Sequence, residues 1–337
     1  MLSKLKSTGL STANKLVSAS KSKLKDVRER VGKTPSKDDY LVALDIGTEY
    51  IKALIGKVNS DGSIDVIGVG RKHQALSDMQ AGAIADIAGV VENCDAALSE
   101  AESQAGVSAR PAIIGIAGEL VKGTTTTIRV ARKEADKSID LEEMERIIRL
   151  VQQRAEQRAK QQLAWEMGGK EVAIRLVNSA LVSIEIDGYP VTNPIGFQGK
   201  DVVIQLYTAF APMIHIGALE KTAEELDLDL IAVAAEPFAV ARAVIGDKQN
   251  QNLSAILMDV DGGTTDIAVV DNGGVQGTEM FGIGGRAYTH AVARDTGVSF
   301  EQAESLKLSF AKNQLAPQKR PAVETALDKT AEVWQGD

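Results

Sequence analysis

Apolar runs and polar turns follow one another most regularly in residues 253–270. An apolar run at 255–258 ends at Asp259, and a second apolar run at 267–270 follows a turn rich in glycine and threonine. A strand, a glycine turn and a returning strand predict a β-hairpin. Paired glycines let backbone N–H groups approach an oxyanion, and threonine hydroxyls add donors, so the turn is suited to phosphate. The turn residues assigned to phosphate binding are Gly262, Gly263, Thr264, Thr265 and Asp266.

The same order of features occurs a second time, near the start of the chain. An apolar run at 41–44 ends at Asp45, and residues 50–56 return after a short turn. Alone, either hairpin fits an ordinary structural turn as well as a nucleotide site. A repeat at far-separated positions predicts two domains of similar design, each offering one phosphate-binding hairpin to a shared cleft. The residues of this hairpin assigned to nucleotide binding are Gly47, Thr48, Glu49 and Tyr50.

Asp45 and Asp259 hold the same position, at the end of the first strand of each hairpin. A carboxylate beside a phosphate is repelled unless a cation lies between them. Mg²⁺ prefers carboxylate and phosphate oxygens and keeps several of its waters. We therefore expect both aspartates on the metal side of a magnesium-bound nucleotide.

The remaining periodicity predicts strands and helices that alternate along the chain. Strands are expected at 64–69, 112–117, 176–186, 202–211 and 231–233, and helices at 84–101, 141–165, 219–226, 237–244, 288–294, around 303–307 and at 323–334. Gly282, Gly284 and Ala287 match the dinucleotide fingerprint G-x-G-x-x-A, but they follow a hairpin strand. We interpret them as a glycine turn before a helix whose N-terminus is able to face the phosphate cleft.

Composition limits the possible classes of protein. A chain of 337 residues has room for about two domains, and 44% hydrophobic with 25% charged residues is typical of a soluble globular protein. A net charge of -8 argues against nucleic-acid binding. The single cysteine, Cys94, permits no internal disulfide and is expected in the core, and His73, His215 and His290 lack metal-ligand spacing. No stretch approaches a membrane-spanning helix, and the N-terminus lacks the apolar region of a signal peptide.

Residues 1–39 differ from the rest of the chain. Their basic residues outnumber the acidic ones, and apolar residues recur at helical spacing. Two alternatives remain open: a basic amphipathic helix on an anionic membrane surface, or a disordered Ser/Lys-rich tail. The apolar positions of the candidate helix are Leu10, Ala13, Val17, Leu24, Val27 and Val31.

These motifs together resemble the actin, hexokinase and heat-shock chaperone ATPase superfamily and, within it, the FtsA family of bacterial cell-division proteins. Residues 45–48 resemble the first phosphate motif of the superfamily and residues 259–266 the second. Residues 113–118 and 193–199 resemble stretches within and after the inserted domain of the FtsA family. The resemblance covers about residues 40–310. It implies an α/β, actin-like two-domain ATPase fold with a small inserted α/β domain in the first domain and an incomplete C-terminal part.

The resemblance also implies domains and further site residues. The implied division is a basic tail at 1–39, a first actin-like domain at 40–73 and 193–252, an inserted domain at 74–192 and a partial second actin-like domain at 253–337. Glu236, before the first connecting helix, is similar to a residue that positions water or metal. Glu304 and Lys307 are similar to a segment that lies against adenosine and ribose, near the glycine turn with Gly284 and Gly285, although alone they fit a solvated helix face.

Two expected features are missing before residue 337: the late Gly-Gly adenosine motif with the second connecting helix, and the membrane-binding C-terminal helix of the family. We therefore expect either a fragment or a short member, with the adenine side of the pocket incomplete.

The implied function is an ATP- and Mg²⁺-binding scaffold that links polymers of an FtsZ-like tubulin homologue to the cytoplasmic membrane. It would be at most a weak ATPase, would contact other division proteins, would self-associate into actin-like filaments and would lie in the cytoplasm, peripheral to the membrane at the division site. No nucleic-acid partner is expected. The alternatives are a small-molecule kinase, for which only the phosphate-motif aspartates offer a base, and a chaperone or pilus-assembly ATPase.

Overall fold

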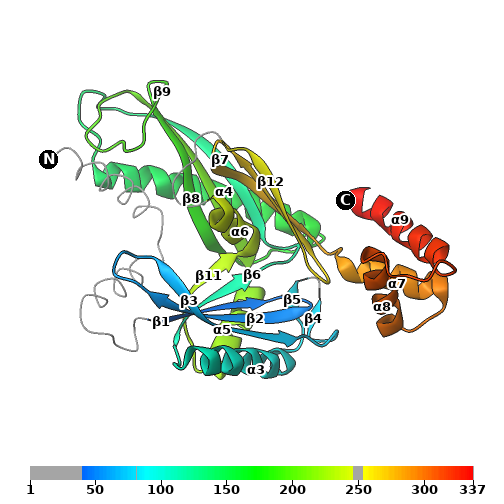
Figure 1. Ribbon diagram of the computed structural model, residues 1–337. Coiled ribbons are helices and arrows are strands. Elements are labelled where there is room, and N and C mark those ends of the chain that lie inside the picture. Colours follow the sequence, from blue (N-terminus) through cyan, green and yellow to red (C-terminus); the bar gives the residue numbers. More distant parts are fainter. Residues whose placement is uncertain (1–39, 81, 246–252, 337) are drawn as a thin grey trace.

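The structure, a computed structural model, describes residues 40–80, 82–245 and 253–336. The N-terminal segment with its two alternatives, a membrane-surface helix or a disordered tail, lies outside the described residues. Within the described part of the chain there are a five-stranded, a seven-stranded and a two-stranded sheet (Figure 1). No helix in these ranges combines the length and apolar character needed to cross a bilayer.

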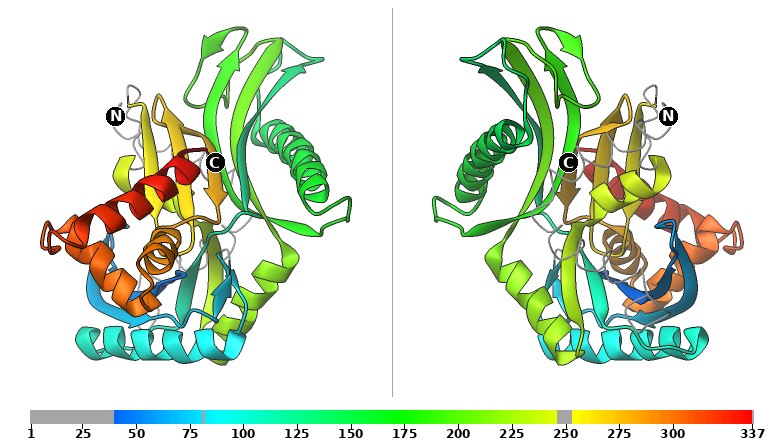
Figure 2. Two further views of the ribbon diagram at one scale, coloured as in Figure 1. Left: turned by 90° about the vertical axis from the view of Figure 1, so that its right-hand side faces the viewer. Right: turned by 90° about the vertical axis from the view of Figure 1, so that its left-hand side faces the viewer.

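The five-stranded sheet has the order β11-β6-β1-β2-β3. Its strands are β1 (Tyr40–Ile46), β2 (Tyr50–Val58), β3 (Ile64–His73), β6 (Pro111–Ile116) and β11 (Asp229–Ala235). The predicted first hairpin is β1 and β2, which pair antiparallel, and β6 joins β1 in parallel. Helices α3 (Ile87–Ala105) and α5 (Met213–Glu225) lie beside this sheet (Figure 2). Val42, Leu44 and Ile46 alternate into its core, as a half-buried strand requires.

The seven-stranded sheet has the order β12-β13-β14-β7-β10-β8-β9. Its strands are β7 (Lys122–Ala131), β8 (Ile174–Ile186), β9 (Tyr189–Pro190), β10 (Asp201–Pro212), β12 (Ala255–Val260), β13 (Thr265–Asp271) and β14 (Gly274–Phe281). Helix α4 (Leu141–Glu166) packs on it through Met144, Ile147 and Val151. The predicted second hairpin is β12 and β13, which pair antiparallel.

The two edges of this large sheet differ. At one edge, β12 exposes the apolar side chains of Ile256, Met258 and Val260. At the other edge, β9 has two residues, and the second is Pro190, which has no N–H to donate. The small sheet of β4 (Met79–Gln80) and β5 (Ala83–Ile84) lies near the end of β1.

Helix α6 (Glu236–Ile245) connects β11 to the region of the second hairpin. Helices α7 (Gly285–Thr296), α8 (Phe300–Ala311) and α9 (Arg320–Gly336) follow β14 and form a cluster with its own small core (Figure 1). Val292, Ala303 and Val323 are completely buried there. The predicted helices after the glycine turn therefore form one compact unit beside the second hairpin.

Several details of the predicted elements differ from the structure; the helix predicted at 219–226, for example, begins at Met213. Strand β7 was not predicted, because its sequence KGTTTTIRVA has no apolar alternation in its first half. The helix predicted at 84–101 begins only at Ile87, because the Asp86 side chain caps it by accepting hydrogen bonds from the N–H groups of Ala88 and Gly89. Ile84 lies in β5 instead. Cys94 is buried in the core, as expected.

The predicted domain boundaries stay a prediction, and the strand pairing bears on them. β10, from the range predicted for the first domain, lies in one sheet with β12, β13 and β14 of the predicted second domain. Within the range 74–192, β6 pairs with β1 in the five-stranded sheet, and α3 packs against the same sheet. By contrast, β7, β8 and α4 belong to the seven-stranded sheet. The part of this range that is separate from the first sheet therefore starts after β6.

Candidate functional site

The turns of the two predicted phosphate hairpins are in direct contact. The backbone N–H of Thr48 donates to Oδ2 of Asp261 over 2.8 Å, and its Oγ1 donates to the same oxygen over 2.9 Å. The N–H of Gly263 donates to Oγ1 of Thr48 over 2.8 Å. Thr48 is buried. The structure thus joins segments more than 200 residues apart in sequence at the position where the hairpin pattern predicted a shared cleft.

Close approach at this junction requires glycine. A Cβ on Gly47 would lie 2.9 Å from Oδ2 of Asp261, and a Cβ on Gly284 would lie 2.3 Å from the carbonyl oxygen of Asp261. The N-terminus of α7 sits against the second turn, because the N–H of Gly285 donates to the carbonyl of Asp261 over 2.9 Å. Three segments therefore meet here: the first turn, the second turn and the start of α7.

Acidic side chains concentrate beneath this junction. Burial raises the pKa of Asp45, and the nearby charges of Asp261 and Asp259 raise it further. The hydrogen bond with Lys52, whose Nζ lies 2.8 Å from Oδ2 of Asp45, opposes this rise. Burial raises the pKa of Asp266 to about 7, and repulsion from Asp259, Asp261 and Asp45 adds to the rise. The neighbouring negative charges thus add to the effect of burial on the pKa values of Asp45 and Asp266.

Glu236 belongs to the same acidic group. It is the first residue of α6, and a Cβ on Gly115 of β6 would lie 2.8 Å from its Oε1. Burial raises the pKa of Glu236 well above its ordinary value, and the charges of Asp45 and Asp266 raise it further. The structure thus places Glu236 with the predicted metal-side aspartates.

The carboxylate oxygens of this acidic group are suited to bind a cation. Oδ1 of Asp45 and Oδ1 of Asp266 are buried and lack a hydrogen-bond partner in the described ranges. A positive charge would relieve both the repulsion and the unpaired oxygens. Among the described residues, no group of three or more His, Cys, Asp or Glu side chains is arranged to hold a metal ion. Carboxylate oxygens such as these two are ligands of the kind that Mg²⁺ prefers.

The Thr265 hydroxyl of the second turn forms hydrogen bonds with other parts of the protein. Oγ1 of Thr265 donates to the carbonyl of Ile283 over 2.7 Å and accepts from Nε1 of Trp334 over 3.0 Å. Thr264 is buried beside it. These bonds hold the second turn against the chain before α7 and against α9. The Trp334 contact had no signal in the sequence, because it joins an isolated aromatic residue to a distant turn.

Arg286 joins the first turn to α7. Its Nε lies 2.9 Å from Oε2 of Glu49, and its Nη2 donates to the carbonyl of Thr48. Its backbone N–H donates to the carbonyl of Gly262 over 2.7 Å. The sequence offered no motif for this residue beyond its place directly after Gly284 and Gly285.

The predicted nucleoside-side residues also come together. Nζ of Lys307, on α8, donates to Oγ1 of Thr289 over 2.8 Å and to the carbonyl of Gly285 over 3.1 Å. Oε2 of Glu304 lies 2.7 Å from the same Nζ and accepts a hydrogen bond from Thr289. Glu304 and Lys307 therefore face the first turns of α7, and the interpretation as a plain solvated helix face is wrong.

Tyr50 is oriented differently from the turn residues. The guanidinium of Arg71 lies 3.4 Å from its ring centroid, and the His73 ring makes an edge contact with it. Nε2 of His73 also lies 3.0 Å from Oε1 of Glu49. The Tyr50 side chain is thus held by β3, away from the contact between the turns.

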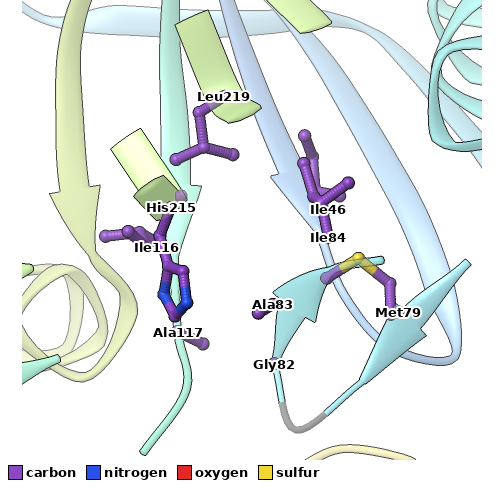
Figure 3. Close-up of a pocket in the computed structure, with 10 residues that line it drawn as sticks. Ile46, Met79, Gly82, Ala83, Ile84, Ile116, Ala117, His215 and Leu219 are labelled. Carbon is purple, nitrogen blue, oxygen red and sulfur yellow. The ribbon is translucent and has the colours of Figure 1, made fainter. Parts of the chain in front are cut away.

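Two hollows lie apart from this junction. The smaller, about 10 Å³, lies between α5, the small sheet and the ends of β1 and β6, and His215 points into it (Figure 3). It has room for about one water molecule. Burial lowers the pKa of His215. The larger, about 860 Å³, lies beside the start of α4 and is lined by none of the predicted site residues.

Comparison with known proteins finds bacterial cell-division proteins that are similar to this chain. It is 27% identical over 276 residues to the cell division protein FtsA of Pseudomonas aeruginosa, covering 80% of this chain and 61% of that protein. It is 27% identical over 273 residues to FtsA of Bacillus subtilis, covering 80% of this chain and 58% of that protein. The resemblance to FtsA is confirmed. No protein-family model matches the chain.

A solved structure supports the fold predicted from the FtsA resemblance. The chain superimposes on a PilM-PilN type IV pilus biogenesis complex with a TM-score of 0.60 and 14% identity, covering 87% of this chain and 75% of that one. The predicted actin-like α/β fold is confirmed. The chain spans about three fifths of the length of the FtsA proteins that it matches.

Proposed function

We propose that this chain is an ATP-binding, actin-like scaffold of bacterial cell division. The contact between Thr48 and Asp261 carries the proposal, because it brings two hairpins of phosphate-binding pattern to one place. The similarity to FtsA proteins supports cell division as the process. The likeness to the pilus complex supports the fold alone.

Different residues at the junction would bind different parts of the ATP molecule and its metal ion. The N–H groups and hydroxyls of residues 262–265 and of residues 47–48 would contact the phosphates, and Thr48 and Gly263 would exchange the bonds that they make between the turns for bonds to the ligand. Asp45 and Asp259 would face the metal, and Glu236 would orient water. When bound, Mg²⁺ would neutralise the charge between these carboxylates and the phosphates.

The nucleoside would lie toward the start of α7. Gly284 and Gly285 allow backbone to approach closely there, and Glu304 with Lys307 presents one charge of each sign beside them. We propose at most weak ATP hydrolysis, in which carboxylates of the acidic group would position water.

The partners follow the same proposal. The chain would bind an FtsZ-like tubulin homologue through the surface of residues 280–312, would self-associate into filaments and would contact other division proteins. Residues 1–31 would bind an anionic membrane surface and hold the protein, from the cytoplasm, at the division site. A pull-down with the C-terminal peptide of the tubulin homologue tests the first contact, and failure to retain it even with a longer chain would count against the scaffold.

Calorimetric titration with ATP, with and without Mg²⁺, tests the nucleotide site. The parent chain is expected to bind more tightly with Mg²⁺, and Asp259→Ala is expected to lose that increase. Asp65→Ala, which removes an exposed carboxylate on β3, is the control and should bind as the parent does. If the parent and Asp259→Ala bind ATP with equal affinity, both with and without Mg²⁺, the proposed metal site is refuted.

A further inference from the structure

Arg286 contacts both phosphate hairpins. Its side chain reaches the first hairpin, with Nε 2.9 Å from Oε2 of Glu49 and Nη2 donating to the carbonyl of Thr48. Its backbone N–H reaches the second hairpin, donating over 2.7 Å to the carbonyl of Gly262. The Arg286 side chain is only 14% exposed, and that of Glu49 is 29% exposed. This guanidinium therefore lies inside the junction.

The ion pair lies directly on the turn proposed to hold phosphate. A Cβ on Gly262 would lie 2.7 Å from Oε2 of Glu49 and 3.2 Å from Nε of Arg286. An anion that reaches the N–H groups of this turn would thus come within range of the guanidinium. It would also meet the Glu49 carboxylate, which it must displace or repel.

The other cations near the junction have different partners. Lys52 is held by Asp45 at 2.8 Å, and Lys307 is held by Glu304 at 2.7 Å. Arg286 is held by a carboxylate that has a second hydrogen-bond partner, because Nε2 of His73 lies 3.0 Å from the other oxygen of Glu49. Glu49 can therefore give up the guanidinium and keep a hydrogen-bond partner.

Arginine suits such an exchange. Its planar guanidinium binds carboxylate and phosphate with the same fork of N–H donors, and it stays charged at any physiological pH. A phosphate carries more charge than a carboxylate and accepts more hydrogen bonds, so it competes well for this side chain.

We propose that Arg286 is a phosphate-binding residue that exchanges Glu49 for a phosphate group of the nucleotide. The inference rests on the proposed nucleotide binding and names a ligand-contacting residue that the hairpin motifs do not contain. In the exchange the guanidinium leaves Glu49 and the Thr48 carbonyl, so phosphate binding at α7 loosens its hold on the first hairpin. Glu49 acts as an internal competitor that lowers the affinity for ATP.

The test is a double-mutant cycle on ATP affinity, measured by calorimetry at fixed ionic strength on the full chain. Arg286→Gln is expected to weaken ATP binding about tenfold or more, and Arg286→Lys, which keeps the charge, to recover part of the loss. Glu49→Gln is expected to strengthen binding in the parent, because it frees the guanidinium. It should give no gain in the Arg286→Gln background.

The control is Arg294→Gln, which removes the same charge from an exposed position on the same helix, where Arg294 pairs with its neighbour Asp295. It should bind ATP as the parent does. If Glu49→Gln gives the same gain with and without Arg286, the carboxylate acts by general repulsion and the exchange is refuted.

Failure of the inference and failure of the proposed function are distinguishable. A parent chain that does not bind ATP refutes the function. A parent that binds ATP, with Arg286→Gln binding equally well, refutes the inference and leaves the function standing. Thermal unfolding without ligand separates a structural role: if Arg286→Gln lowers only the melting temperature, the ion pair is a structural link between the hairpins. Should Arg286→Gln fail to fold, Arg286→Lys and Glu49→Gln still decide the matter.

Discussion

Asp266 is expected to make the stability of the chain depend on pH. Its carboxylate lies in β13, opposite Asp259 of β12, and its Oδ1 is buried without a partner in the described ranges. Burial raises its pKa from 3.8 to about 7. A carboxyl group whose pKa is higher in the folded state binds its proton more tightly there. The associated stability is therefore present in full below the unfolded pKa, near 3.8, and is lost as pH rises through about 7.

The size of this effect follows from the pKa shift. A rise of about three units corresponds to about 4 kcal/mol of folding free energy, which the chain gives up between pH 4 and pH 8. Asp266→Asn keeps the shape of the side chain and removes the charge. We expect it to be more stable than the parent by up to about 4 kcal/mol at pH 8, and to match the parent near pH 4.

Urea unfolding at pH 4, 6 and 8, in the presence of a chelator, measures this difference. Asp271→Asn, at an exposed position of the same strand, is the control and should follow the parent at every pH. Addition of ATP with Mg²⁺ should stabilise the parent at pH 8 more than Asp266→Asn, because the cation would offset the buried charge. Parallel stability curves for the parent and Asp266→Asn between pH 4 and pH 8 would refute the reasoning.

Three further predictions concern other parts of the chain. Thr48→Ala removes the two side-chain hydrogen bonds between the turns and leaves the Gly263 N–H without its acceptor. Urea unfolding should therefore show a loss of about 1–3 kcal/mol, whereas the exposed Thr127→Ala should show none. Arg132→Ala leaves the half-buried Glu143 carboxylate and two carbonyl oxygens without their donor, and unfolding should show a loss of about 1–3 kcal/mol that Lys133→Ala does not cause. In vesicle co-sedimentation, the full chain should bind anionic lipid and a chain starting at Thr34 should not, since each basic residue near the surface contributes about 1 kcal/mol. Binding should weaken with salt, and equal sedimentation of both chains would favour a disordered tail.

Local patterns explain most of what the sequence predicted. The hairpins at 41–56 and 255–270 follow from apolar runs broken by short turns, and the turn at Asn272 with Gly273 has the positive φ angles that such a pair favours. β7 was not predicted because threonine favours strands but is polar, so the four threonines of β7 give no alternation of apolar and polar residues.

The site was predictable in its parts and not in its contacts. The repeated Asp, Gly and Thr positions identified both turns. The ion pair between Glu49 and Arg286 joins residues 237 positions apart, and no repeating pattern in the sequence indicates such a pair. The same holds for Asp261, whose bonds to the first turn depend on the packing of two sheets. The acidic group also acts collectively, since each raised pKa reflects burial and neighbours that no single segment contains.

The unequal edges of the seven-stranded sheet set a limit on how the protein can grow. A second copy that added its β12 to the exposed β12 edge would pair antiparallel, because like edges meet about a twofold axis. Each outer edge of the joined sheet would then be formed by β8, with the two-residue strand β9 along its end. Growth by this route stops at two chains. Because this pairing uses the β12 edge of both copies, any longer filament must grow through other surfaces of the molecule.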